Sequence, residues 1–143
     1  MIEQWDELKA DERAGESALA GIPTSIPALA RAQAIQRRAA RVGFAFDSIE
    51  ETWRALDEEL RELREAHTSA EKREELGDAM FALANLAREL HIDAEDALRA
   101  TSRHFAGRFT TLEEIVEERH LDLRQSPLEQ KLALWQEAKN RRA

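Results

Sequence analysis

The chain contains 143 residues, the length of one domain, and 43% of them are hydrophobic while 35% are charged. This apolar content excludes intrinsic disorder, and the presence of only five glycines and three prolines argues against an all-β fold, so the composition favours helices. The absence of cysteine excludes disulfides and thiolate metal sites, and the net charge of −8 disfavours duplex nucleic acid as a partner.

The chain also lacks the sequence signals of membrane proteins. It has no apolar run of about eighteen residues, and its first residues, MIEQWDELKADER, are acidic and do not resemble a signal peptide. We therefore expect a cytoplasmic protein without a membrane partner.

Residues 2–13 are expected to form a short leading helix, and a loop follows to residue 24. The next helix is predicted to start at Ser25 as N-cap, with Pro27 in its first turn, and to end near Val42 at the sequence GFAF. This helix has one basic face, which is either solvated or contacts an acidic neighbouring subunit, and its members are Arg31, Arg37, Arg38 and Arg41.

Two strongly patterned helices follow. Asp47 and Glu50 predict a capping box at the start of the first helix, which continues to about His67. Its apolar stripe is expected to face the core and consists of Ile49, Trp53, Leu56, Leu60 and Leu63. Thr68 and Glu71 predict the capping box of the second helix, which is apolar nearly all round in its middle and therefore central. Its stripe consists of Leu76, Met80, Leu83, Ala87 and Leu90.

The remaining chain is predicted to contain three further helical segments. Asp93 is expected to cap a helix through Phe105, Gly107 to break or kink it, and Thr110 to begin a separate segment that ends near His120. The sequence SPLE at 126–129 marks a last helix. We predict an all-α bundle of about four core helices in a single domain over 1–143, with a leading helix and loop (1–24), a core bundle (25–106) and C-terminal helices (107–143).

The acidic residues concentrate in the middle of the chain, where residues 47–100 contain sixteen acidic and seven basic side chains. Within this region the sequences EELRE (58–62) and EELGD (74–78) fall on the two consecutive patterned helices. Residues three apart lie on one side of a helix, and two helices joined by a short turn pack antiparallel. The carboxylate pairs that can then face each other are Glu59 with Glu62 and Glu75 with Asp78.

Four converging carboxylates predict a metal site. They repel one another unless a cation lies between them, and Mg²⁺ prefers oxygen ligands and often completes its shell with substrate phosphates. The alternative is an ordinary solvated helix surface, because a chain with this charge content contains many acidic pairs at this spacing. A di-iron site is disfavoured, since it needs two Glu-x-x-His motifs on facing helices and the pair Glu117 and His120 supplies one.

These residues resemble the MazG-type nucleoside triphosphate pyrophosphohydrolases. The two acidic motifs match the family signature, and the likeness to the C-terminal module of two-module members covers nearly the whole chain. The other matching stretches are WDELKADER (5–13), IPALARAQAIQ (26–36), RAARVGF (38–44), NLAR (85–88) and Trp135. The resemblance implies the all-α NTP pyrophosphatase fold and a homodimer or higher homo-oligomer. It also implies Mg²⁺-dependent hydrolysis of an NTP or dNTP to the monophosphate and pyrophosphate for nucleotide-pool house-cleaning, with Mn²⁺ as a substitute for Mg²⁺.

The resemblance also implies roles for single residues. Metal ligands are implied at Glu59, Glu62, Glu75 and Asp78, and Glu58 is our candidate to orient or deprotonate the attacking water. Contacts to the nucleotide are implied at Lys9, Glu74, Asn85, His104, Arg108 and Trp135. Among these, Lys9 and Arg108 would neutralise phosphate oxygens, and Trp135 would either stack on the base or simply pack. Trp5 and Trp53 are interpreted as packing residues, with Trp53 in the core.

The sequence departs from the family pattern downstream of the acidic motifs. Family members commonly have K-x-N-x-K-F-x-R-R-F where this chain has ATSRHFAGRF at 100–109, so that the substituted positions are Ala100, Ser102, His104 and Gly107. A family lysine before the second acidic motif is Glu71 here. These changes thin the phosphate and sugar contacts, and the alternative function is a non-catalytic dimerisation module with weakened nucleotide binding.

Overall fold

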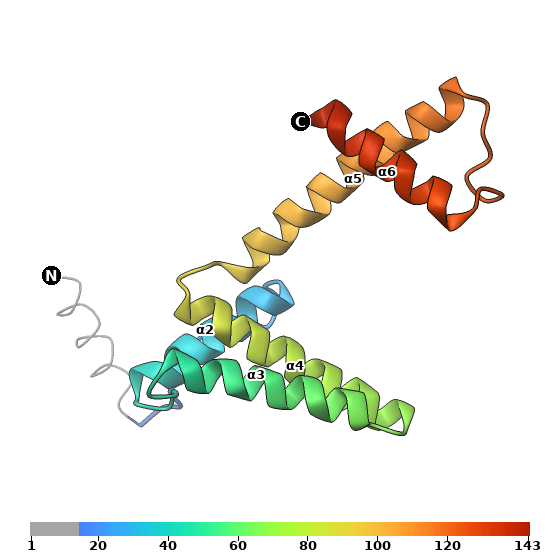
Figure 1. Cartoon of the computed structure of the whole chain (residues 1–143). Helices are drawn as coiled ribbons and strands as arrows, with labels where there is room; N and C mark the ends of the chain where they lie inside the picture. The colour runs from blue at the N-terminus through green and yellow to red at the C-terminus, as the bar shows by residue number, and fades with distance from the viewer. Residues whose placement is uncertain (1–14) are drawn as a thin grey trace, which may run out of the picture. The chain divides into compact units, whose positions relative to one another are not determined.

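The computed structural model describes residues 15–143, and all the regular structure in this part of the chain is helical, which confirms the all-α fold (Figure 1). The predicted leading helix lies outside the described residues. Among residues 15–143, no helix has both the length and the apolar character that crossing a bilayer requires. The helices are α2 (Ala28–Arg41), α3 (Ile49–Glu65), α4 (Ser69–Glu89), α5 (Ala94–Glu118) and α6 (Leu128–Arg142).

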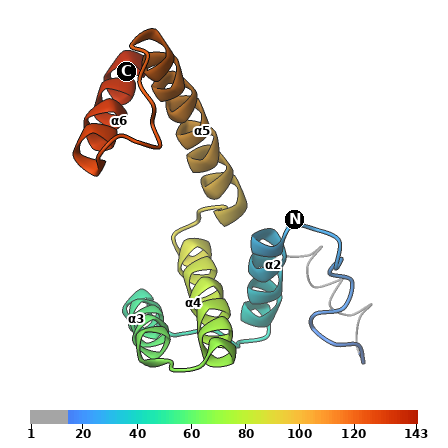
Figure 2. The same cartoon turned by 90° about the vertical axis from the view of Figure 1, so that its right-hand side faces the viewer.

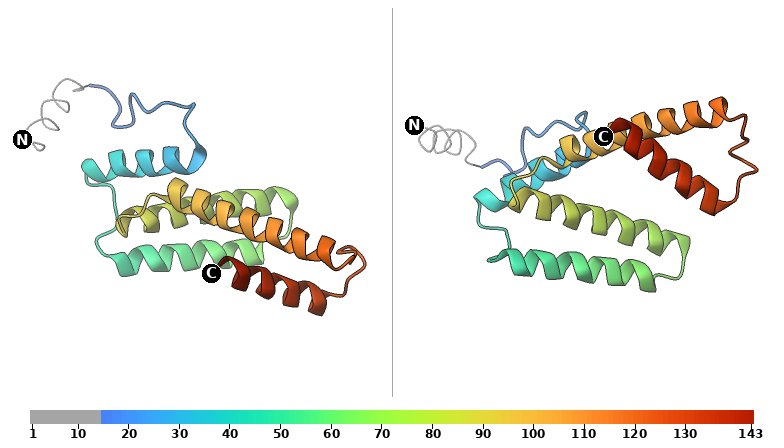
Figure 3. Two further views of the ribbon diagram at one scale, coloured as in Figure 1. Left: turned by 90° about the horizontal axis from the view of Figure 1, so that it is seen from above. Right: turned by 45° about the horizontal axis from the view of Figure 1, so that its top comes forward.

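The chain divides into two compact units, of which the first ends at Glu95 and the second comprises Asp96–Ala143. In the first unit α4 lies between α2 and α3 and contacts both (Figure 2). Residues 66–68 join α3 to α4, and this short connection makes the two helices antiparallel neighbours (Figure 3). The predicted single-domain organisation stays a prediction.

Two predicted N-caps are wrong, one by one residue and the other by two. Helix α3 is capped by Ser48, whose hydroxyl accepts a hydrogen bond from the Glu51 amide at 3.3 Å, and not by Asp47. The sequence offers the same cap pattern at both positions, and the structure uses the second. Helix α2 has Pro27 at its N-cap position instead of Ser25, without any side-chain cap.

The predicted capping box of α4 is confirmed. The Thr68 hydroxyl accepts a hydrogen bond from the Glu71 amide, and the Glu71 carboxylate accepts one from the Thr68 amide. Hydrogen bonds from the backbone amides of His67 and Thr68 lower the pKa of Glu71. Because this box fixes the first turn of α4, it also fixes which residues of that helix face α3.

Three helices end in a residue with left-handed backbone conformation. At the end of α2, Gly43 has φ 88°, its amide donates to the Ala40 carbonyl, and the Phe44 amide donates to the Ala39 carbonyl. Glycine suits this position because it has no Cβ, and the motif turns Phe44 away from the helix axis. His91 and His120 occupy the equivalent positions after α4 and α5 with φ 59° and 54°, so these two histidines have a backbone role.

The predicted break at Gly107 is wrong, because α5 continues from Ala94 to Glu118 without interruption. A single glycine costs a helix only about 1 kcal/mol relative to alanine, which the surrounding turns can offset. The structure also shows a use for it, since a Cβ at position 107 would lie 2.7 Å from an Arg142 Nη atom. Helices α5 and α6 bury a small core made of Leu112, Ile115, Leu134 and Ala138.

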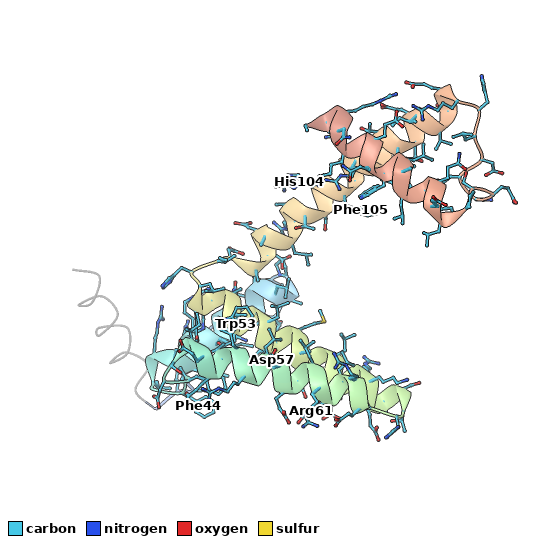
Figure 4. The ribbon with its side chains drawn as sticks, viewed as in Figure 1. Phe44, Trp53, Asp57, Arg61, His104 and Phe105 are labelled. Atoms are coloured by element: carbon cyan, nitrogen blue, oxygen red, sulfur yellow. The ribbon has the colours of Figure 1, made fainter. Side chains whose placement is uncertain are left out.

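The expectation that Trp53 lies in the core is also wrong, since it is 48% exposed (Figure 4). The same holds for most of the predicted stripe of α4, of which Leu76, Met80, Leu83 and Leu90 are exposed. The buried residues of α4 are Ala79, Ala84 and Leu86, and Leu56 of α3 is buried too. Several other large apolar side chains of the α3–α4 hairpin remain exposed among the described residues.

Candidate metal and nucleotide site

Three of the four predicted metal ligands come together between α3 and α4. Carboxylate oxygens of Glu59, Glu62 and Glu75 all lie within 4.8 Å of one another, and all three residues are half-buried. The antiparallel hairpin brings them together, because Glu59 and Glu62 lie one turn apart on α3 and Glu75 lies opposite on α4. The sequence prediction that the two acidic motifs face each other agrees with this arrangement.

The cluster holds negative charge that no basic residue in the described part of the chain neutralises. One Oε2 atom each of Glu59 and Glu75 is inaccessible to solvent and has no hydrogen-bond partner among the described residues. No ion pair within residues 15–143 involves Glu59, Glu62 or Glu75. Buried, unpaired carboxylate oxygens are costly, so the cluster favours a positive charge that residues 15–143 do not supply.

The raised pKa values of two cluster members have the same cause, which is negative charge held close together and partly out of water. Burial raises the pKa of Glu59 above its ordinary 4.5, and the charges of Glu62 and Asp78 raise it further. Burial, followed by the interaction with Glu62, also raises the pKa of Glu75. Glu62 therefore interacts with both of the other carboxylates and is the centre of the cluster.

Asp78 lies beside this cluster and is exposed. Its oxygens are not within the 4.8 Å group, but its charge contributes to the raised pKa of both Glu59 and Glu75. Asp78 and Glu59 also line a cavity of about 810 Å³ in the first compact unit. Asp78 therefore lies beside both the acidic cluster and this cavity.

Glu58 is exposed on α3 and interacts with two side chains, Arg61 and Glu62. Its carboxylate pairs with Arg61, which also bonds Glu65 at 2.6 Å on the exposed side of α3 (Figure 4). The hydrogen bond from Arg61 lowers the pKa of Glu58, and a weaker interaction with Glu62 adds to this. Glu58 is thus held as an anion beside Glu62 of the carboxylate cluster.

The two remaining predicted residues of α4 differ in their surroundings. Glu74 is exposed next to the cluster residue Glu75. Asn85 lines the cavity, and its Oδ1 accepts hydrogen bonds from Arg88 at 2.9 and 3.2 Å. Because that oxygen is occupied, the NH₂ group is the part of Asn85 that can bind a ligand.

Three of the residues assigned to the nucleotide belong to the second compact unit, and Lys9 lies outside the described residues. The Arg108 guanidinium lies 4.9 Å from the centre of the Trp135 ring, and the Phe105 ring lies 5.0 Å from it. His104 is exposed on α5 (Figure 4). The structure thus brings Arg108 and Trp135 into contact.

Sequence reasoning missed the residues that form the cavity walls. The sequence GFAF predicts the end of a helix, and Phe44 also falls in a stretch that matches the family, but neither Phe44 nor Phe46 was assigned to the site, and both line the cavity. Gln36 likewise falls in a matching stretch without an assigned role, and it lines the same cavity and is only 6% exposed. A glutamine on the apolar side of a helix was the available signal, because buried amides need hydrogen-bond partners.

A scan against protein-family models gives no match for the chain. Comparison with curated proteins does find relatives. The chain is 39% identical over 138 residues to a protein of Thermotoga maritima named "Nucleoside triphosphate pyrophosphohydrolase/pyrophosphatase MazG", and the match covers 95% of this chain and 54% of that protein. It is 40% identical over 147 residues to a protein of Escherichia coli named "Nucleoside triphosphate pyrophosphohydrolase", covering 97% and 56% respectively.

A third relative is "Uncharacterized protein YabN" of Bacillus subtilis, which is 35% identical over 145 residues, covering 97% of this chain and 30% of that protein. The chain spans about half the length of the first two curated relatives it matches. Their similarity therefore corresponds to one module of longer proteins.

Proposed function

We propose that this chain, which belongs to the MazG-type nucleoside triphosphate pyrophosphohydrolase family and matches one module of its relatives, hydrolyses nucleoside triphosphates to the monophosphate and pyrophosphate. The observation that carries the proposal is the cluster of Glu59, Glu62 and Glu75 at the edge of a cavity. The cluster supplies a metal site, and the cavity supplies room for the organic part of a nucleotide.

The residues of the cluster fit a hard divalent cation. All the donors are carboxylate oxygens, two of them buried without a partner, and Mg²⁺ or Mn²⁺ prefers such oxygens. We propose that Glu59, Glu62 and Glu75 hold the ion, with Asp78 as a fourth ligand at the cavity side. When bound, Mg²⁺ would neutralise charge on the triphosphate oxygens and lower the pKa of a coordinated water.

Glu58 is proposed to orient the attacking water. Its pKa is lowered by Arg61, so it is a weak base at neutral pH and remains an acceptor of hydrogen bonds. This favours an orienting role over proton abstraction. Contacts from Lys9, Glu74, Asn85, His104 and Arg108 to the nucleotide, and stacking of Trp135 on its base, are further parts of the proposal.

The proposed function is tested by incubating the protein with each common NTP and dNTP in the presence of Mg²⁺ and separating the products. We expect pyrophosphate and the monophosphate in equal amounts, no release of orthophosphate, and loss of all product when EDTA removes the metal. Release should also be lost in Glu59→Gln. If no nucleotide yields pyrophosphate, the chain is the non-catalytic module that the altered stretch at 100–109 suggested.

We also propose that the chain self-associates through the α3–α4 hairpin. The exposed side chains of this hairpin form an apolar surface of the kind that marks protein interfaces, and they include Trp53, Leu60, Leu76, Met80 and Leu83. Sedimentation equilibrium is expected to give a dimer or higher oligomer. Leu83→Asp should shift the protein toward monomer, while Asp57→Asn on the same hairpin should not. A monomeric wild-type protein would overturn this proposal.

A further inference from the structure

We infer that Arg88 is a positioning residue, which holds the side chain of Asn85 so that the NH₂ group of Asn85 faces the cavity and donates a hydrogen bond to the bound nucleotide. The inference rests on the proposed function, because it takes a nucleotide to be the ligand of the cavity. Arg88 itself belongs neither to the carboxylate cluster nor to the described residues that line the cavity.

The orientation of the Asn85 amide follows from its two hydrogen bonds with Arg88. The Nε and Nη2 atoms of Arg88 both donate to Asn85 Oδ1, at 3.2 and 2.9 Å. A guanidinium carries donors only, so the reversed amide would place the donors of its NH₂ group against the donors of Arg88. Arg88 therefore determines which end of the amide points away from it, and that end is the NH₂ group.

The NH₂ group of Asn85 is open to a ligand. Asn85 lines the cavity, and no acceptor within residues 15–143 binds its Nδ2 atom. This atom is also not among the buried polar atoms that lack a partner, unlike the Gln36 oxygen. Asn85 follows Asp78 by two turns of α4, which is about 10 Å along the helix axis. A nucleotide whose phosphates lie at the carboxylate cluster can therefore place its sugar or base beside Asn85.

Arg88 is itself held in place. Its side chain is 18% exposed, whereas that of Arg61, which forms ion pairs on the exposed side of α3, is 50% exposed. Arg88 Nη2 lies 3.7 Å from Glu89 Oε1, and Glu89 Oε2 accepts a hydrogen bond from Thr52 Oγ1 at 2.7 Å. Thr52 is a buried residue of the neighbouring helix α3. Because Thr52 fixes Glu89, the guanidinium of Arg88 keeps a defined position next to Asn85.

A fixed donor binds a ligand better than one that turns freely. Without Arg88 the Asn85 amide can rotate, and binding must then select one of its orientations, which costs free energy. The hydrogen bond to the nucleotide lies away from the carboxylate cluster, so we expect it to be equally strong in the substrate complex and in the transition state. Losing such an interaction raises KM and leaves kcat unchanged.

The test is a double-variant comparison, made with the nucleotide that the wild type hydrolyses with the highest kcat/KM. Asn85→Ala removes the donor and should raise KM about tenfold with kcat within about twofold of the wild type. Arg88→Met keeps a long side chain without donors and should raise KM about fivefold. The double variant Asn85→Ala/Arg88→Met should have the KM of Asn85→Ala, because Arg88 acts through Asn85. Arg88→Lys, which keeps a donor, should recover most of the wild-type affinity.

Gln33→Met is the matched control for a general loosening of the helices. Gln33 is buried on α2, and its Nε2 donates to the Ala84 and Ile92 carbonyls at 3.1 and 3.0 Å. This variant should lower Tm and leave KM unchanged. The inference is wrong if Arg88→Met has the wild-type KM, if the two effects multiply in the double variant, or if Gln33→Met raises KM equally.

A further measurement does not depend on the folding of Arg88→Met. By NMR, the Nε–H proton of Arg88 should exchange more slowly with solvent in the wild type than in Asn85→Ala, and equal rates would overturn the inference. If the wild type hydrolyses no nucleotide, the proposed function fails, and ATP with Mg²⁺ then serves as a binding probe. Calorimetry should show the same non-additive increases in Kd. Additive increases would overturn the inference, and so would a wild type that does not bind ATP.

Discussion

Replacing Glu62 with glutamine is expected to lower kcat for pyrophosphate release by about 10³-fold. A metal ion supplies several kcal/mol of charge stabilisation in a transition state of this kind, and each 1.36 kcal/mol corresponds to a factor of ten in rate. Glu62 is the most damaging position because its charge acts on both Glu59 and Glu75. Its loss removes one ligand and also loosens the arrangement of the other two. Steady-state kinetics at saturating nucleotide measures the effect.

The specificity of this loss is checked with a charge change nearby. Asp57 lies on α3 two residues before Glu59, is exposed, and belongs to no described cluster (Figure 4). Asp57→Asn should leave kcat unchanged within about twofold, because Asp57 is not among the charges that raise the pKa of Glu59 or Glu75. A similar decrease in Asp57→Asn and Glu62→Gln would mean that bulk charge matters and not the three-carboxylate site.

The carboxylate cluster was predictable from sequence because local rules determine it. Residues three apart share a helix face, a short turn makes the helices antiparallel, and the capping box at Thr68 sets the register of α4. None of these steps requires knowledge of distant contacts. The acidic pairs on consecutive helices were therefore correctly expected to face each other.

The wrong predictions concern features that depend on a choice between two cap residues or on contacts with residues far away in the sequence. Both Asp47 and Ser48 satisfy the cap pattern, and local sequence does not show that the structure uses Ser48. Periodicity shows that Trp53 belongs to an apolar face, but it does not show whether the chain covers that face. The hydrogen bond from Gln36 to the Phe81 carbonyl was not predictable from local sequence, because the two residues are 45 positions apart.

The second large effect concerns the protein without metal. The double variant Glu59→Gln/Glu75→Gln is expected to melt several degrees above the wild type in EDTA, because it removes two half-buried charges that repel each other. In excess Mg²⁺ the order should reverse. An ion at 100 times its dissociation constant stabilises the folded wild type by about 2.7 kcal/mol, and the variant lacks the ligands that gain this stabilisation. Differential scanning calorimetry in both buffers measures the reversal, and equal stabilisation of both proteins by Mg²⁺ would contradict it.

The pH dependence of the metal-free wild type follows from the same two groups. The pKa values of Glu59 and Glu75 are raised in the folded state, so between the unfolded and folded values the folded protein binds more protons. Its stability therefore increases as the pH falls from neutrality toward 4.5, and the stability advantage of the double variant should shrink.

The contribution of Glu137 to stability has the opposite pH dependence, because Arg119 lowers the pKa of Glu137. Its contribution is present above the unfolded pKa and is lost as the pH falls through the folded one. Glu137→Gln should therefore be destabilising at neutral pH and progressively less so in acid, which distinguishes the carboxylate cluster from ordinary acid denaturation.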